Sequence, residues 1–445
     1  MKNNDFHFHY FQNLEIGIIF LLLSYILTYV FIRKQFYSIF DPLFFYFLMS
    51  AAGYSVVFYL YYFQLISEYY FYSFLLTQVS FFIGLNFFKM PKVKSEEDRR
   101  GPYLARGIAG YLYLISFFLF LILQIVVYYY NGLPVFMDSR LEIFSGGSGF
   151  GIIGRVIYVT STISLVISSY SLIFKDSIGL PKLLHGLVLL FYVFVAIVSG
   201  SKGALLLMIF IISLMLYFSR KRLSSSRVEK KANKILIFIL FLVFPAALFT
   251  VIIQSGLDSY AEVAIAIAMR FIHTGQIFYM TYPNDILFSF PEANGFIALF
   301  RDIFGSLRII SWDELPVNHG LLAFQHHYPT IDTITGPNDR HNTFGLFYFG
   351  FFGSVIFSFL MGFIVSYIRN FLYKRLSFNL INMSLYALLV MAANNLNQDP
   401  SGMAVGYFYS IGLVFTPLFF ISYMFFEISK KGKTIERNIF NTYSL

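Results

Sequence analysis

A series of long apolar segments constrains this chain more than any other feature of its sequence. A transmembrane α-helix needs about 20 predominantly apolar residues to cross a bilayer. Eleven segments have this character: roughly 14–32, 42–63, 70–88, 104–130, 151–174, 183–199, 203–218, 235–254, 342–368, 379–396 and 404–428. They predict an all-α polytopic membrane protein with about 11 transmembrane helices, within a range of 10 to 13.

The composition agrees with a membrane protein. Only 12% of the 445 residues are charged, whereas soluble domains carry about 25%. The absence of cysteine excludes disulfide bonds, thiolate metal sites and cysteine nucleophiles. The first apolar segment is too long for a signal peptide, so we expect no cleavable leader. We expect residues 1–445 to form a single integral membrane domain.

The distribution of Lys and Arg predicts which connections face the cytoplasm, because cytoplasmic loops are enriched in these residues. The cation-rich connections are 33–41, 89–106, 175–182, 219–234, 369–378 and the tail after residue 428. The connections between them are poor in cations, which places 131–150 and 281–341 on the extracytoplasmic side. The net charge of +9 follows from this pattern, so we expect no nucleic-acid partner.

The polar stretch 281–341 is the expected working part of the protein. Five of the eight histidines lie in or beside it, as does the only tryptophan. Long loops of this kind are often functional. The stretch leads into an apolar segment, which places His341 at the mouth of a membrane helix. Residues 260–280 and 294–312 must both cross the membrane or both stay on one side, and the lack of Lys or Arg between them favours re-entrant or interfacial helices.

Arg270 and His341 are the first candidates for chemistry. A charge at membrane depth is costly and is therefore a functional candidate. Arg270 suits an anion site because its planar guanidinium matches phosphate oxygens; the alternative is a snorkelling side chain or an ion pair with Glu262. His341 suits a general base near neutral pH; the alternative is a surface or helix-start residue. Asn342 beside it suits a helix cap.

Three further cations come from separate connections. Lys202 lies among small residues in 199–203, which resembles the end of a phosphate loop but lacks its first glycine and strand, so we do not expect an NTPase. A simple tight turn is the alternative for Lys202. Arg140 and Arg155 flank a glycine cluster that allows close backbone approach. With Arg270, these cations are expected to converge on one diphosphate. No HExxH motif or carboxylate cluster accompanies the two adjacent histidines at 326–327, so we expect no metal.

Together these residues resemble the Wzy-type O-antigen polymerases, which are oligosaccharide repeat-unit polymerases of bacterial membranes. The resemblance rests on four features: 132–136 with the downstream Arg140, 199–206 with Lys202, Arg270 near the external loop, and 340–342 running into 349–353. It implies a metal-independent glycosyltransferase with a GT-C-like architecture and without a cofactor. It also implies a multi-pass protein of the bacterial plasma membrane, the cell inner membrane.

The resemblance further implies substrates and residue roles. The growing glycan would move from undecaprenyl diphosphate onto a hydroxyl of the next lipid-linked repeat unit at the outer leaflet. Membrane lipid and a chain-length regulator protein are the other implied partners. His341 and Arg270 would be catalytic, and the implied substrate-binding residues are Arg140, Arg155, Lys202, Arg340, Asn342 and His273. The alternatives are an O-antigen ligase, with a lipid A core acceptor, and a lipid-linked oligosaccharide flippase or other transporter.

Overall fold

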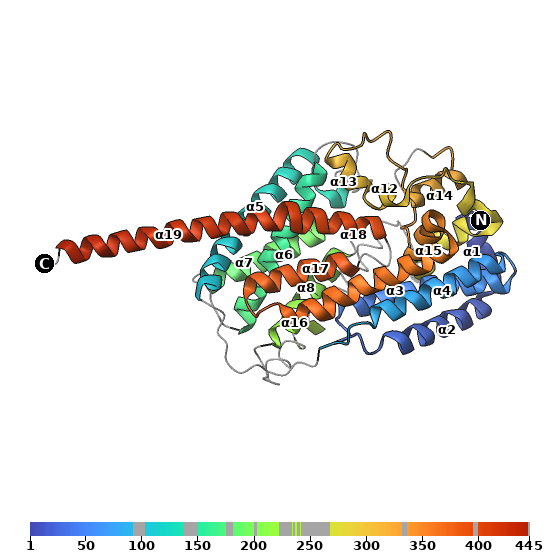
Figure 1. Cartoon of the computed structure of the whole chain (residues 1–445), viewed down its shortest axis with the longest axis horizontal. Coiled ribbons are helices and arrows are strands. Elements are labelled where there is room, and N and C mark those ends of the chain that lie inside the picture. Colours follow the sequence, from blue (N-terminus) through green and yellow to red (C-terminus); the bar gives the residue numbers. More distant parts are fainter. Residues whose placement is uncertain are drawn as a thin grey trace. The chain divides into compact units, whose positions relative to one another are not determined.

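A computed structural model gives the fold of the chain (Figure 1). It describes residues 1–91, 103–137, 150–174, 181–199, 203–221, 268–331, 336–394 and 399–443, with 234, 236, 237 and 241. Every regular element in these ranges is a helix, which confirms the all-α prediction. The chain groups into two compact units. Unit 1 comprises 1–91, 256–375 and 390–406, and unit 2 comprises 92–255, 376–389 and 407–445.

The helices confirm a polytopic membrane protein, although not the number of spans. Among the described residues, six helical stretches are long and apolar enough to cross a membrane, and three shorter apolar helices accompany them. The six are Leu14–Ile32, Pro42–Tyr62, Ala105–Phe136, Gly151–Phe174, His341–Arg375 and Pro400–Gly432. The predicted span at 235–254 lies almost wholly outside the described residues. The predicted count of eleven is therefore not established.

Unit 1 holds the N-terminal helices and most of the polar stretch. Its elements are α1 (Asn3–Gln12), α2 (Leu14–Ile32), α3 (Pro42–Tyr62), α4 (Glu68–Leu85), α11 (Gln276–Thr281), η2 (Pro283–Ser289), α12 (Gly295–Leu299), α13 (Arg301–Ser306), α14 (His319–His327), α15 (His341–Ser366), η3 (Tyr367–Leu372), α16 (Tyr373–Arg375) and α18 (Pro400–Gly406). The stretch 281–341 contains several short helices, and α12 and α13 lie within 294–312, where re-entrant or interfacial helices were expected. Their buried apolar side chains account for this, because Ile286, Ala298 and Ala323 all lie in the interior.

Unit 2 is a bundle around an aliphatic core. Its elements are α5 (Tyr103–Asn131), η1 (Pro134–Phe136), α6 (Phe150–Phe174), α7 (Lys182–Val198), α8 (Ala204–Ser219), η5 (Tyr407–Phe415) and α19 (Thr416–Tyr443), and α17 (Leu380–Asn394) begins in it. Leu112, Ile163 and Leu388 are among the residues with no exposed surface in its core. A polar contact crosses this core, where the Tyr113 hydroxyl accepts a hydrogen bond from Ser168 at 2.9 Å.

The helix α15 is broken at Gly350. This glycine has φ 68° and ψ −173°, a region of backbone conformation that is essentially restricted to glycine. Residues on its two sides meet in antiparallel order: Gly345 packs against Ser354, the ring of Phe344 stacks on Phe357, and His341 lies beside Ser358. The segments 341–349 and 351–366 therefore form a helical hairpin rather than one straight span.

The hairpin carries its first residues deep into unit 1. Segment 351–366 runs alongside α4, with Tyr69 beside Phe351 and the Ser80 hydroxyl donating to the Val355 carbonyl at 2.7 Å. His341 stacks on Phe81, which lies thirteen residues after Glu68. At 1.5 Å per residue, that places His341 about 20 Å along α4 from its first residue. Because the chain turns back at Gly350, His341 is buried within unit 1 and has no exposed surface.

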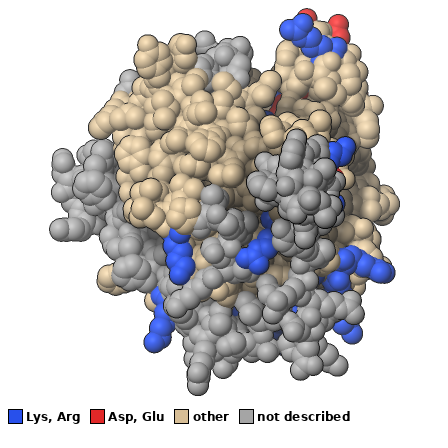
Figure 2. All heavy atoms as spheres, turned by 90° about the vertical axis from the view of Figure 1, so that its left-hand side faces the viewer, with Lys and Arg blue, Asp and Glu red and all other residues tan. Residues whose placement is uncertain are grey.

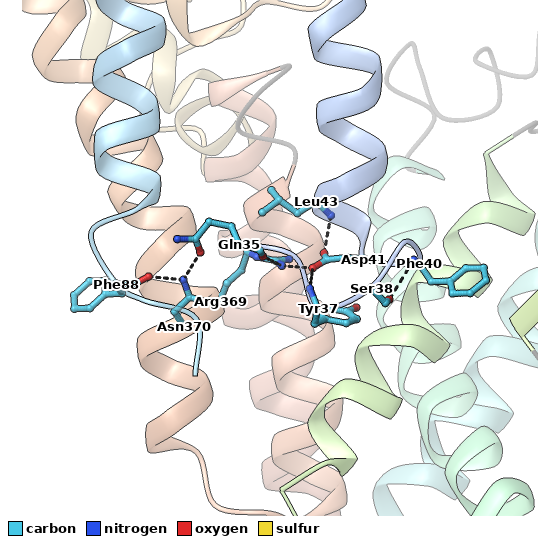
Figure 3. A network of polar contacts seen from close by, with 9 residues as sticks. All are labelled: Gln35, Tyr37, Ser38, Phe40, Asp41, Leu43, Phe88, Arg369 and Asn370. Carbon is cyan, nitrogen blue, oxygen red and sulfur yellow. Dashed lines mark hydrogen bonds and ion pairs between the residues drawn. The ribbon is translucent and has the colours of Figure 1, made fainter. Parts of the chain in front are cut away.

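The opposite end of unit 1 is held by a buried polar network (Figure 3). Arg369, in η3, pairs with Asp41 at 2.6 Å, and both side chains are almost fully buried. Asp41 also caps α3 by accepting from the Leu43 N–H at 2.9 Å, while Pro42 occupies the first helical turn, where its missing N–H costs nothing. Asn370 donates to Gln35 at 2.8 Å. The network ties the end of α2, the start of α3 and η3 together.

Exposed cations surround this network. Arg33, Lys34, Lys89, Lys374 and Arg375 are all exposed at the ends of α2, α4 and α16. We call this the cation-rich end of unit 1; α1 and α14 lie at the other end. Figure 2 looks at the left-hand side of Figure 1, and among the residues that it colours by charge Lys and Arg predominate over Asp and Glu.

Candidate functional site

A small polar pocket in unit 1 gathers the most chemistry among the described residues. Its volume is about 60 Å³, enough for a few water molecules or a small polar group. Polar and charged side chains from four segments face it. They are Arg301 and Asp302 from α13, Asn318 and His319 at the start of α14, Asp339 and Tyr348, and Asp399 and Ser401 at the start of α18. We call it the carboxylate pocket.

The start of α14 and the segment before α15 are held together by close backbone packing. A Cβ on Gly320 would lie 1.8 Å from the carbonyl oxygen of Pro337, and one on Gly336 would lie 2.4 Å from the carbonyl oxygen of Gly320. Asn318 caps α14 by accepting a hydrogen bond from the Gly320 N–H at 3.0 Å. Because they lack a Cβ atom, the two glycines allow the two backbone segments to approach this closely. The close approach places Asp339 beside His319.

His319 and Asp339 form a buried pair at the wall of the pocket. The Nδ1 atom of His319 lies 3.2 Å from Oδ1 of Asp339, and neither atom has an aligned hydrogen-bond partner. The imidazole stacks on Phe347 with ring centroids 5.1 Å apart, which fixes its plane. Buried polar atoms usually have partners. A ligand hydroxyl in the pocket is a suitable partner for both groups.

Asp399 is a second carboxylate in the same pocket. Its Oδ1 atom accepts from the Ser401 hydroxyl at 2.7 Å and from the Gly402 N–H at 2.9 Å. Burial raises the pKa of Asp399 above its ordinary value; the Gly402 hydrogen bond acts in the opposite direction, and the nearby Asp339 raises the pKa further. A carboxylate with a raised pKa is a better proton acceptor near neutral pH. The two hydrogen bonds to Oδ1 thus orient the Asp399 carboxylate, and its raised pKa suits it to receive a proton.

The pocket is predominantly acidic and has an aromatic neighbour. Asp302, Asp339 and Asp399 line it together with one arginine, Arg301. The Arg301 guanidinium also lies 5.9 Å from the ring centre of Trp312, whose side chain is exposed. Carboxylates accept hydrogen bonds from hydroxyl groups, and exposed tryptophan offers a flat apolar surface. The combination suits an uncharged polyhydroxylated ligand, and the excess of carboxylates opposes a diphosphate.

His341 and Asn342 lie in the interior and do not line this pocket. His341 has no exposed surface, and its Nδ1 atom lies 3.0 Å from the Ser358 hydroxyl. The Asn342 amide donates to Thr77 at 2.9 Å, so it links α15 to α4 instead of binding at the surface. The prediction that His341 is the catalytic base stays untested, but its burial makes the carboxylates better placed for that role.

Arg340 links the start of α15 to other segments of unit 1. Its side chain is buried, and its guanidinium donates twice to the Thr274 carbonyl, with a length of 2.9 Å from Nε. The same guanidinium lies over the rings of Tyr54 and Phe278, at 5.6 and 5.8 Å from their centres. Burial lowers the pKa of Arg340. These contacts join the start of α15 to α3 and α11, so the structure gives Arg340 a packing role at this position.

Arg270 and His273 lie near the N-terminal helix. Arg270 is exposed. His273 packs edge-on against His7, with ring centroids 4.8 Å apart, and the Tyr279 hydroxyl lies 3.4 Å from its Nδ1 atom. Burial, and then the neighbouring Arg270 charge, lower the pKa of His273. Glu262, the expected ion-pair partner of Arg270, lies outside the described residues.

The remaining predicted cations are not brought together by the described structure. Arg155 belongs to unit 2, where its guanidinium lies 4.4 Å from the ring centre of Tyr409. Arg140 and Lys202 lie outside the described residues, as do residues 138–149 of the predicted loop 131–150. The convergence of these cations on one diphosphate stays a prediction.

Sequence reasoning missed His319 as a pair for Asp339 and missed Asp399 altogether. The available signal for Asp399 was its position before Pro400, since an aspartate that precedes a helix-initiating proline is a common cap. The signal for His319 was the Asn-His-Gly sequence that begins α14. In the described part of the chain, no group of three or more His, Asp or Glu side chains has the arrangement of a metal site.

Comparisons of the chain with protein-family models, curated protein sequences and solved structures found no match.

Proposed function

We propose that this protein is a membrane glycosyltransferase that polymerises lipid-diphosphate-linked oligosaccharide repeat units. The single observation that carries the proposal is the carboxylate pocket, in which His319, Asp339 and Asp399 face one polar space near the exposed Trp312. The resemblance of the sequence to Wzy-type O-antigen polymerases supplies the substrate class, undecaprenyl-diphosphate-linked sugars at the outer leaflet of the bacterial plasma membrane. In this proposal, one hydroxyl group of the acceptor sugar enters the pocket.

The reaction requires one proton acceptor and a stabilised leaving group. The acceptor hydroxyl oxygen bonds to the anomeric carbon of the growing glycan while the bond from that carbon to the lipid diphosphate breaks. The hydroxyl proton passes to Asp399, whose raised pKa suits the transfer. The His319–Asp339 pair holds the acceptor through hydrogen bonds. Transfer of this kind needs no metal when cations stabilise the departing diphosphate.

The diphosphate binds outside the carboxylate pocket in this proposal. Three carboxylates against one arginine make the pocket unfavourable for a group with several negative charges. Arg270 is exposed and belongs to the same unit, and its planar guanidinium matches phosphate oxygens. Arg140, Arg155 and Lys202 keep their proposed roles at the diphosphate and glycan. Within the proposal, Arg270 is the catalytic cation.

The pocket is tested by carboxamide substitutions in a strain that lacks the chromosomal gene. Asp399→Asn removes the proton acceptor and keeps the shape, so we expect roughly 100- to 10,000-fold less long-chain glycan at normal protein level. Asp339→Asn is expected to weaken the acceptor interaction. Glu292→Gln is the matched control, because Glu292 is exposed outside the pocket. The measurement is the glycan ladder on a gel together with an immunoblot. Wild-type ladders from both pocket variants would overturn the assignment.

The hairpin of α15 favours transport as a second candidate function. Discontinuous helices with polar residues at depth are typical of transporter binding sites, and the hairpin brings Arg340 and His341 deep into unit 1. The glycan of the deletion strain separates the alternatives. Loss of long chains with one repeat unit still attached indicates a polymerase, whereas loss of every repeat unit indicates a flippase or an O-antigen ligase.

A further inference from the structure

An apolar groove lies between α2 and α3, away from the carboxylate pocket. Its volume is about 360 Å³, within the 300–1,000 Å³ typical of ligand sites. Both helices and the turn between them supply its walls. The lining residues are Tyr25, Ile26, Thr28, Tyr29, Val30 and Ile32 of α2, Phe36, and Phe44, Phe47, Leu48 and Ala51 of α3.

The groove opens on a helix that contacts few parts of the protein. Ile18, Ile19, Leu22, Ile26 and Val30 are all strongly exposed along α2, and a row of exposed aliphatic side chains on a membrane helix faces lipid. The floor of the groove is formed by Thr28, Ile32 and Ala51, which are buried, in contrast to the exposed outer row of α2. A hydrocarbon chain in the groove therefore contacts side chains of α2 on one side and of α3 on the other, instead of the mobile chains of bulk lipid.

Positive charge marks one end of the groove. Ile32 and Phe36 line that end, and Arg33 and Lys34, the residues next along the chain from Ile32, are exposed. The nearby Asp41 does not neutralise them, because its carboxylate is buried and pairs with Arg369. An apolar groove that ends at two cations is complementary to a molecule with a long hydrocarbon chain and an anionic head.

We propose that this groove binds one anionic glycerophospholipid. One acyl chain lies between α2 and α3, and the phosphate interacts with Arg33 and Lys34 at the cation-rich end of unit 1. Juxtamembrane cations attract anionic headgroups, each strengthening binding about fivefold. The pair is therefore expected to contribute roughly 30-fold. This site is independent of the glycosyltransferase proposal.

The test uses the full chain, purified in detergent, stripped of lipid and then titrated with defined phospholipids. Native mass spectrometry counts the molecules bound. We expect one dioleoyl phosphatidylglycerol per chain, and weaker binding of dioleoyl phosphatidylcholine, which has the same acyl chains and no net charge. Arg33→Gln/Lys34→Gln is expected to lower the affinity for phosphatidylglycerol roughly 30-fold. The matched control is Lys374→Gln/Arg375→Gln, which removes an adjacent exposed pair at the same end of unit 1.

The apolar part of the site is tested separately. Ala51→Phe fills the groove, since Ala51 forms part of its floor, and is expected to abolish stoichiometric binding. Dihexanoyl phosphatidylglycerol keeps the head and shortens the chains, so it is expected to bind much more weakly than the dioleoyl lipid. Equal binding of phosphatidylglycerol and phosphatidylcholine by the wild type would overturn the proposal. An equal loss of affinity in both charge variants would also overturn it, because it would show a general surface effect.

Discussion

At the residue scale, two histidines close to the same polar segment have different chemical surroundings. His319 faces the carboxylate pocket beside Asp339. His341 packs flat against Phe81, with ring centroids 4.5 Å apart, and has no exposed surface. Proton exchange with a substrate requires direct reach or one bridging water. His319 meets that condition at the pocket, whereas His341 contributes to the packing of α15 against α4.

His7 gives the protein a measurable dependence on pH. Burial and the neighbouring His273 lower the pKa of His7 from 6.5 to about 4. The unfolded chain therefore binds a proton between these values that the folded chain does not, and stability rises with pH over that range. We expect thermal stability in detergent to fall as the pH is lowered from about 6.5 to about 4, and to lose no more from His7 below that value.

Two substitutions separate His7 from the other titrating groups. His7→Phe removes the titrating group and is expected to reduce the loss of stability on acidification. His326→Gln serves as the control, because His326 is exposed, and it is expected to leave the pH dependence as in the wild type. A melting-temperature profile with the same slope in wild type and His7→Phe would contradict the prediction.

At the element scale, the hairpin of α15 determines where the polar segment lies. The turn at Gly350 is sharp, since a Cβ on Gly353 would lie 2.7 Å from the Cβ of Phe349. A 35-residue helix over 341–375 would be about 52 Å long at 1.5 Å per residue, longer than a bilayer of about 30 Å requires. Segment 351–375 alone is long enough to span. The first nine residues of α15 are therefore free to pack inside unit 1.

Gly350→Ala tests the hairpin. Alanine is strained at φ 68° and ψ −173°, and such strain costs about 1–3 kcal/mol. We expect a lower midpoint of thermal unfolding and less long-chain glycan, because the segment before α15 would no longer reach its position. Gly186→Ala is the control, since a Cβ there meets nothing within 4 Å. Equal stability of the two variants would show that residues 341–349 do not depend on this turn.

The Asp41–Arg369 pair is expected to stabilise the cation-rich end of unit 1. Both side chains are buried, and removing one partner of a buried pair typically costs about 3–5 kcal/mol because the other charge loses its compensation. Asp41→Asn is expected to lower the unfolding midpoint strongly. The double variant Asp41→Asn/Arg369→Met is expected to recover part of the loss. Glu15→Gln, at an exposed site on α2, is the control. A double variant no more stable than Asp41→Asn would argue against an uncompensated charge as the cause.

At the scale of the whole molecule, hydropathy predicted the long helices well and the structure of residues 281–349 poorly. The predicted spans 14–32, 42–63 and 151–174 match α2, α3 and α6 to within one residue at each end, because each is a continuous apolar run. The hairpin was not predicted because the residues on both sides of Gly350 are apolar. A hydropathy profile is the same for a straight helix and for a chain that reverses direction at this glycine. His319 and Asp339 lie twenty residues apart in the sequence, and they meet through the close backbone approach of Gly320 to Pro337, which no local pattern encodes.

The orientation of the protein in the membrane is a prediction that cysteine labelling can test. The chain has no cysteine, so a single introduced thiol reports one position. Asp313 and Lys374 are both exposed in unit 1. We expect an impermeant thiol reagent to label Asp313→Cys in intact cells, and Lys374→Cys only after permeabilisation, because cations favour the cytoplasmic side. The reverse pattern would invert the topology and place the stretch 281–341 in the cytoplasm.

The broken helix α15 also determines the order in which the chain can be assembled. The uncharged, predominantly apolar run 351–368 is long enough to enter the bilayer on its own. Arg340 cannot, because its guanidinium is buried against the Thr274 carbonyl and the rings of Tyr54 and Phe278, and a charge without these partners is costly in hydrocarbon. Insertion of the polar segment must therefore follow the packing of α3 and α11. We therefore expect the burial of Arg340 to be a late step in the folding of unit 1.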